Sequence, residues 1–162
     1  MKNAVDNPIL NSPFEQPSRY YDFTGAEPRI LDGRRPAGYH GTVRTEQMEG
    51  ALAAHEFITL PEVNKIRERV RQWHEAHWPG VTPVTRDILE HWHRKDRRPL
   101  FFCQREAVET IIWLTEAAPA DRQGIEIPQD EPNDPESAKK GYQPLRRLCT
   151  KLATGSGKTT VM

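Results

Sequence analysis

The residues best suited to chemistry lie near the end of the chain, in a run rich in glycine, lysine and threonine. Residues 153–160 read Ala-Thr-Gly-Ser-Gly-Lys-Thr-Thr. Glycines at 155 and 157 let the backbone curl so that successive N–H groups converge on phosphate oxygens, and no β-carbon blocks their approach. Lys158 would bring a positive charge to the β and γ phosphates, and the Thr159 hydroxyl would ligate a shared magnesium ion. The run therefore predicts a binding loop for a nucleoside triphosphate and Mg²⁺.

This predicted phosphate loop departs from the usual P-loop pattern at one position. The pattern asks for glycine at 152, where this chain has leucine, so the match is to a looser form of the motif. The alternative is a flexible tail, but Leu148, Thr150 and Leu152 alternate with Cys149 and Lys151, which predicts a strand leading into the loop, as a phosphate loop requires. The residues expected to contact the nucleotide here are Thr154, Gly155, Ser156, Gly157, Lys158, Thr159 and Thr160.

A glutamine next to two aromatic residues stands about fifty residues upstream of the loop, at the start of a predicted helix. The amide of Gln104 can donate to and accept from the N6/N7 edge of adenine at once, a match that guanine does not offer. Phe101 or Phe102 could stack on the purine face. Taken alone, these residues are better explained as two core phenylalanines and a surface glutamine. Together with the phosphate loop, they favour an adenine-binding role for Gln104 and Phe102.

The elements that must position these groups fall into three regions. Residues 1–45 are rich in proline and glycine, which predicts an extended, loop-rich arm whose apolar side chains lie along another surface. Residues 46–99 predict a small helical region. Its first long helix is expected to begin at Pro61 and to end near Trp78, and a second to begin near Pro83.

The third region, residues 100–162, predicts the start of an α/β domain. A helix is expected from about Cys103 to Ala118, followed by a mobile, proline-rich insertion over 119–144 and by a strand and P-loop over 147–162. A weaker pattern over 45–54, in the middle region, predicts a short helix. The second helix is expected to present Ile88, Leu89 and Trp92 on one face. The buried stripe expected on the third helix consists of Ala107, Val108, Ile111 and Ile112.

Composition limits the class of protein. Lysine plus arginine and aspartate plus glutamate both count 23, so no global charge excess points to nucleic acid. Cys103 and Cys149 have no CxxC spacing, which argues against a disulfide-built secreted domain or a cysteine-based zinc site and fits a cytoplasmic protein. No apolar run approaches the roughly 20 residues that span a bilayer, so we expect no membrane segment.

The middle region contains two further groups of polar residues. Helical spacing could bring histidines together as zinc ligands. Because no cysteine or consistent carboxylate lies nearby in the sequence, packing and surface roles are the favoured interpretation. A modest basic surplus over 62–98 could touch DNA phosphates, and solvated helix faces explain it equally well. The histidines are His74, His77, His91 and His93.

Two segments together resemble a known family. FFCQREAVETIIWL at 101–114, followed by RRLCTKLATGSGKTTVM at 146–162, resembles the Q motif and motif I of superfamily 2 helicases, specifically the DEAD/DEAH-type ATPase of type III-like restriction enzyme subunits. Residues 7–23, 33–39 and 79–92 resemble the leader that precedes the motor in a subset of these proteins. The resemblance implies an incomplete RecA-like P-loop domain that uses ATP and Mg²⁺, within a protein that couples ATP hydrolysis to DNA movement in a restriction system.

The resemblance also assigns individual residues and partners. Gln104 takes the place of the adenine-reading glutamine, and Phe101 or Phe102 that of the stacking aromatic residue. DNA would be bound through the parent protein, and a methyltransferase or specificity subunit is a candidate partner. The places in the phosphate loop fall to Gly155, Gly157, Lys158 and Thr159.

The sequence departs from this family as well. It has no DEAH-type acid pair, no second RecA-like lobe and no arginine that completes the ATP site, so this chain alone is not expected to turn over ATP. We therefore expect the N-terminal part of a hydrolase that stops just after motif I, with unpaired strand edges and poor stability. The alternatives are a non-catalytic binding or structural fragment, a gene remnant, or an unrelated P-loop protein such as a small kinase. The glutamine motif and the long leader argue against the last.

Overall fold

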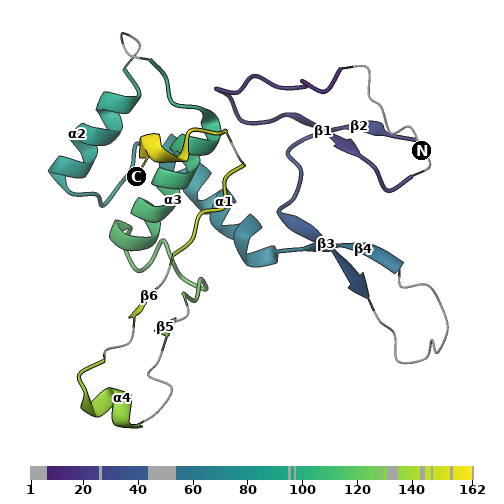
Figure 1. The fold of residues 1–162 in the computed structure, drawn as a ribbon. Helices are drawn as coiled ribbons and strands as arrows, with labels where there is room; N and C mark the ends of the chain where they lie inside the picture. The colour runs from purple at the N-terminus through teal and green to yellow at the C-terminus, as the bar shows by residue number, and fades with distance from the viewer. Residues whose placement is uncertain are drawn as a thin grey trace.

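The structure, a computed structural model, describes residues 7–25, 27–43, 54–94, 96, 98–127, 129–130, 135–142, 145–146, 148–153 and 155–161. The described helices are α1 (Pro61–Glu75), α2 (Pro83–Trp92), α3 (Phe102–Glu116) and α4 (Pro135–Lys139), with one 3₁₀ turn, η1 (Lys158–Val161). The described strands are β1 (Arg19–Asp22), β2 (Arg29–Asp32), β3 (Gly38–Val43), β4 (Ala54–Thr59), β5 (Gln129–Asp130) and β6 (Leu145–Arg146). The three longer helices gather into one body, from which the paired strands extend (Figure 1).

The described strands form separate antiparallel pairs, β1 with β2, β3 with β4, and β5 with β6. In the longest pair, Gly38 lies opposite Thr59 and Val43 opposite Ala54. The predicted class, mixed α and β, is confirmed. A RecA-like domain is built on a parallel sheet, and the described ladders are all antiparallel, so the RecA-like fold stays a prediction.

The hydrophobic core lies among α1, α2 and α3, and the three helices occur where the sequence predicted them. Pro61 occupies the first turn of α1, and the Thr82 side chain caps α2 by accepting a hydrogen bond from the Thr85 N–H. Helix α1 ends at Glu75, before the predicted end near Trp78. The buried cluster consists of Val70, Trp73, Trp78, Leu89, Trp113, Leu114 and Ala117.

The face that α3 buries differs from the predicted one. Ala107 is buried, but Ile111 is 39% exposed, whereas Trp113 is fully buried. Helical residues that are two positions apart in the sequence lie about 200° apart around the helix axis. Burial of Trp113 therefore turns Ile111 toward solvent. Ile88 in α2 is likewise 43% exposed, because the neighbouring Leu89 is the residue fully buried. The prediction that Ile111 belongs to the buried stripe of α3 was wrong.

The N-terminal arm is neither free nor without strands. The Phe102 N–H donates to the Pro13 carbonyl at 2.8 Å, and the rings of Phe14 and Phe101 lie 5.4 Å apart. Arg34 holds Glu106 of α3 with paired bonds of 2.5 and 2.6 Å. The arm thus lies along the start of α3, as the spacing of its apolar residues predicted. The strands of the arm, β1, β2 and β3, are short, because proline and glycine interrupt the chain between them.

Part of the predicted insertion packs against the helical body. Arg69 of α1 donates to the Asp121 carbonyl at 3.0 Å, and Lys65 donates to the Gly124 carbonyl at 2.5 Å. Ile125 and Ile127 pack against the core cluster. The predicted insertion thus begins with a segment, 119–127, that contacts the helical body through two isoleucines and two backbone carbonyls. Mobility of 119–144 stays a prediction. Farther along, β5, α4 and β6 project from the body (Figure 1).

The predicted strand before the phosphate loop is absent from the described residues. Residues 148–153 have no regular structure, and β6 ends at Arg146. A strand is stable only beside a partner, and among the described residues the partner β5 extends over Gln129–Asp130. Arg147 and most of the predicted helix at 45–54 lie outside the described residues, and Ala54 begins β4.

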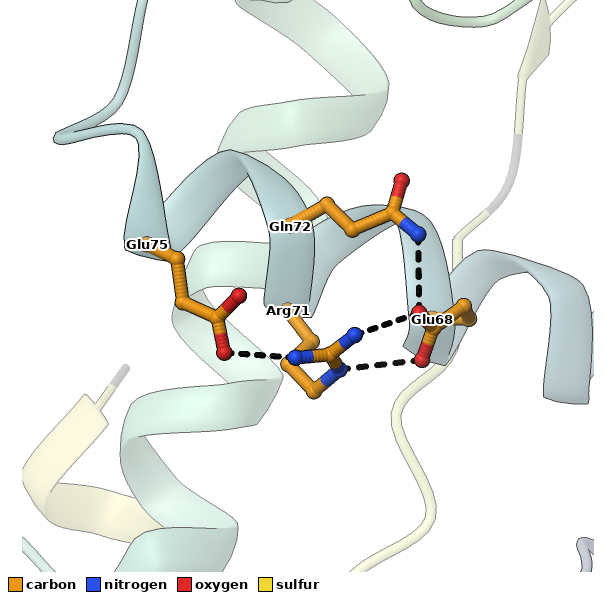
Figure 2. Close-up of polar contacts among 4 residues, drawn as sticks. All are labelled: Glu68, Arg71, Gln72 and Glu75. Atoms are coloured by element: carbon orange, nitrogen blue, oxygen red, sulfur yellow. Dashed lines mark hydrogen bonds and ion pairs between the residues drawn. The ribbon is translucent and has the colours of Figure 1, made fainter.

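The solvent face of α1 carries a network of charged side chains (Figure 2). Arg71 donates to Glu68 at 2.6 and 3.0 Å and to Glu75 at 2.5 Å, and Gln72 donates to Glu68 at 2.8 Å. The bonds from Arg71, and then the bond from Gln72, lower the pKa of Glu68 from 4.5 to about 2. The stabilisation is therefore present above about pH 4.5 and is lost as the pH falls through about 2. It is small, because both partners are largely solvated.

Replacing Arg71 by methionine should raise the pKa of Glu68 toward 4.5, because the largest source of its depression is removed. NMR titration of the Glu68 side-chain carboxyl measures this directly. Glu75→Gln is the matched control, since it leaves the Arg71–Glu68 contact in place. An Arg71→Met chain in which Glu68 still titrates near 2 would contradict the network.

The Arg34–Glu106 pair should contribute measurably to stability, because both side chains are about four-fifths buried. A double-mutant cycle with Arg34→Met and Glu106→Gln should give a coupling of about 1.5–3 kcal/mol, the range for hydrogen bonds to charged groups. Urea unfolding followed by tryptophan fluorescence supplies the free energies. The exposed Arg94–Asp96 pair should show a smaller coupling. Equal coupling in both pairs would mean that the arm is not held by Arg34.

Candidate functional site

Both glycines of the predicted phosphate loop have left-handed backbone conformations. Gly155 and Gly157 have φ of 79° and 70°, while Ser156 between them does not share the positive φ. The Ser156 N–H donates to the Ala153 carbonyl at 3.3 Å, so this N–H group already has a partner within the loop. Anion binding by the loop stays a prediction. Thr154 lies outside the described residues.

The loop's side chains bond to its own carbonyls. The Ser156 Oγ donates to the Ala153 carbonyl at 2.7 Å. The Lys158 Nζ donates to the carbonyls of Leu152 and Ala153 at 3.2 and 3.1 Å. The ammonium group thus lies over the loop while remaining exposed to solvent. A phosphate bound at the loop would offer Lys158 charged acceptor oxygens in place of these neutral carbonyls.

The predicted helix start after Lys158 is a single 3₁₀ turn, η1, rather than an α-helical turn. Thr159 lies in this turn and is exposed, so its hydroxyl is accessible to a magnesium ion from solvent. Thr160 is also part of η1. Because η1 contacts α3, the phosphate loop is positioned by the helix that carries Gln104.

Gln104 joins the two predicted motifs directly. Its Oε1 accepts from the Phe101 N–H at 2.9 Å, and its Nε2 donates to the Gly157 carbonyl at 2.9 Å. The side chain is 5% exposed, so this amide is buried between the start of α3 and the loop. A primary amide has two N–H groups and two acceptor lone pairs, so one donor and one acceptor remain, which is the pair that adenine requires. Adenine recognition by Gln104 stays a prediction.

The two phenylalanines are both half-buried and already have partners. The ring of Phe101 lies against Phe14. The guanidinium carbons of Arg34 and Arg105 lie 5.3 and 5.4 Å from the centre of the Phe102 ring. These are cation–π contacts, so a purine stacking on Phe102 would have to displace one guanidinium group. Purine stacking on Phe102 stays a prediction.

A second polar cluster joins α1, α2 and α3. The Nδ1 of His74 lies 2.8 Å from Oε1 of Glu109, and the Nε2 of His93 lies 3.6 Å from the same oxygen. The Trp78 indole N–H also donates to this oxygen at 3.2 Å. Glu109 is 4% exposed, so its carboxylate is buried among these rings.

Sequence reasoning missed this cluster because it looked for a carboxylate close to the histidines in the chain. Glu109 lies 35 residues beyond His74 and reaches it only through the packing of α3 on α1. One signal was present, since Glu109 precedes the buried Trp113 by four residues and so lies on the core face of its helix. His77 and His91 are exposed, as expected for surface imidazoles.

Comparisons with protein-family models, with curated protein sequences and with solved structures gave no match. No helix among the described residues is long and apolar enough to cross a membrane. The interpretation of the phosphate loop and of the histidine cluster therefore depends on their own geometry.

Replacing Gln104 by leucine should loosen the phosphate loop, because it keeps the side-chain volume and removes both amide hydrogen bonds. The Phe101 N–H and the Gly157 carbonyl then lose their partner, at a cost of about 1–3 kcal/mol in the free energy of unfolding. Amide hydrogen exchange over 155–161 should become faster. Gln123→Leu, at an exposed position, is the control. Unchanged exchange in Gln104→Leu would contradict the buried bridge.

Proposed function

We propose that this chain binds Mg²⁺-ATP at residues 153–160 and provides the ATP-binding part of a DNA helicase or translocase. The observation that carries the proposal is the hydrogen bond from the Gln104 Nε2 to the Gly157 carbonyl. The sequence assigned Gln104 to the base and Gly157 to the phosphates of one nucleotide. Their direct contact across 53 residues supports the proposal, because it brings the two predicted motifs together.

The phosphate part of the proposal is supported by the loop's backbone and its lysine. Positive φ angles such as those of Gly155 and Gly157 occur in anion-binding loops, and an anion would compete with the Ala153 carbonyl for the Ser156 N–H. Lys158 now donates to neutral carbonyls, and charge-assisted bonds to phosphate oxygens are about twice as strong as such neutral bonds. ATP would therefore draw the ammonium group toward the β and γ phosphates. Thr159 would then ligate the magnesium ion that neutralises them.

The adenine part of the proposal depends on the free half of the Gln104 amide. Its remaining N–H and lone pair match the N7 and N6 groups of adenine and mismatch the corresponding edge of guanine. Because the side chain is almost fully buried, the base would have to approach beside the start of α3, where Phe102 lies. Preference for ATP over GTP follows from this contact.

Coupling of ATP to DNA movement is proposed on the resemblance to superfamily 2 helicases of restriction systems, with their RecA-like fold. In such a protein, DNA and a methyltransferase or specificity subunit would be the partners. The alternative is a non-catalytic binding or structural fragment. It predicts a folded chain with no affinity for Mg²⁺-ATP, so a binding measurement separates the two.

Calorimetric titration of Mg²⁺-ATP into the purified chain should show binding at one site, weaker for GTP. Lys158→Ala should weaken binding by about tenfold or more, because a charge-assisted hydrogen bond contributes about 1.5–3 kcal/mol. Gln104→Ala should reduce the preference for ATP over GTP.

Lys151→Ala is the matched control, because Lys151 is an exposed lysine just before the loop and has no predicted phosphate contact. Circular dichroism checks that each variant keeps its helices. A folded chain that binds no Mg²⁺-ATP, or one whose affinity falls equally in Lys151→Ala and Lys158→Ala, would overturn the proposal.

A further inference from the structure

We propose that His74, His93 and Glu109 form a binding site for a divalent transition-metal ion of the zinc class. The three side chains come from the last turn of α1, the residue that ends α2, and the middle of α3. Imidazole nitrogen and carboxylate oxygen are ligands that zinc accepts, and two histidines with one glutamate are a known ligand set for zinc sites that keep an open position. This inference is independent of nucleotide binding.

The distances among the ligand atoms suit one small ion. In a tetrahedral zinc site with bonds of about 2.0–2.1 Å, neighbouring ligand atoms lie about 3.4 Å apart. The His74 Nδ1 and His93 Nε2 lie 2.8 and 3.6 Å from Oε1 of Glu109, and all the ligand atoms lie within 4.8 Å of one another. The two separations from the Glu109 oxygen thus bracket the tetrahedral value, and rotation of the side chains would adjust the separation between the two histidines.

The hydrogen bonding of His93 prepares its other nitrogen for a metal. Its Nδ1 lies 2.7 Å from the Leu89 carbonyl, and a carbonyl only accepts, so Nδ1 carries the proton. In neutral imidazole the Nε2 then presents a lone pair. Metal-binding histidines are usually oriented in this way, by donation from the other ring nitrogen to a carbonyl or carboxylate.

The Nε2 of His93 is buried and has no hydrogen-bond partner among the residues that the structure describes. The Glu109 carboxylate, which is itself an acceptor, lies 3.6 Å from it. A lone pair facing a carboxylate without a donor between them is unfavourable in a buried place. A cation between Nε2 of His93 and Oε1 of Glu109 would attract both the lone pair and the carboxylate and so remove their repulsion. A proton on His93 would do so too, and the experiment below distinguishes the two.

The backbone beside the cluster is strained. His77 and Trp78 have φ of 61° and 52°, a left-handed conformation that is rare for a residue as large as tryptophan. Arg86 holds this turn by donating to the carbonyls of both residues, at 2.9 and 3.2 Å. The turn places the Trp78 indole so that its N–H reaches Glu109, with its ring 4.9 Å from that of His93. Strain of this kind concentrates at functional sites.

The proposed site lies beneath an open depression on the surface. His74, Trp78 and His93 line this depression, together with Arg86 and Glu90, whereas Glu109 is buried behind them. A metal ion would therefore reach the carboxylate by movement of these side chains. Three protein ligands leave the fourth position of a tetrahedron to a water molecule or another small ligand from this depression.

Titration of Zn²⁺ into the chain, after removal of metals with a chelator, tests the proposal. Calorimetry should show one zinc ion bound per chain, with release of protons and a rise in melting temperature. Co²⁺ in place of Zn²⁺ should give the visible absorption of a tetrahedral ion, and addition of zinc should abolish it. His93→Ala and Glu109→Gln should each weaken zinc binding by more than about 100-fold, beyond the typical loss from a supporting residue.

His91→Ala is the matched control, because it removes an exposed histidine from the same helix and should leave the affinity unchanged. Lys158→Ala should also leave it unchanged, which separates this site from the phosphate loop. Proton-dependent pairing of His93 with Glu109, without a metal, predicts no cobalt spectrum and no zinc binding by the unmodified chain. Either of these results, or zinc binding that survives both ligand substitutions, would overturn the proposal.

Discussion

Burial of polar side chains on α3 is the constraint on which the rest of the structure depends. Gln104 and Glu109, on this one helix, are the buried polar or charged residues within the described part of the chain. A buried amide or carboxylate is costly unless its hydrogen-bonding groups have partners. The partners come from segments far away in the sequence, namely Gly157 for Gln104 and His74 for Glu109. The hydrogen bonds of these two side chains therefore attach the phosphate loop and α1 to α3.

The arm is attached to the same helix by a third polar contact. Arg34 bonds to Glu106 and lies over Phe102, so the first turns of α3 are covered on one side by the arm. On another side, the Gln104 amide holds the loop. The start of α3 thus connects segments that have little apolar surface of their own. This explains how a proline-rich chain can order its arm and its glycine-rich loop, since neither has to build a core.

The parts of the fold that depend on local sequence could be predicted, and those that depend on distant partners could not. Apolar spacing and proline placed α1, α2 and α3 correctly, because helical hydrogen bonds close within four residues. The strand expected before the loop is absent from the described residues. A strand needs a neighbouring strand, and β5 pairs with β6 there over Gln129–Asp130. Glu109 was missed as a partner of the histidines for the same reason. The left-handed turn at Trp78 carries no glycine to signal it.

The self-bonded state of the phosphate loop is compatible with binding rather than opposed to it. A hydrogen bond within a protein contributes about 1 kcal/mol net, because each group exchanges one partner for another. Lys158 and Ser156 use neutral carbonyls of residues 152 and 153, which phosphate oxygens can replace with stronger, charge-assisted bonds. The Gln104–Gly157 bond involves neither Lys158 nor Ser156, so the proposed change of partners would leave the loop attached to α3. Part of the cost of ordering the loop would then be met by the fold before a ligand arrives.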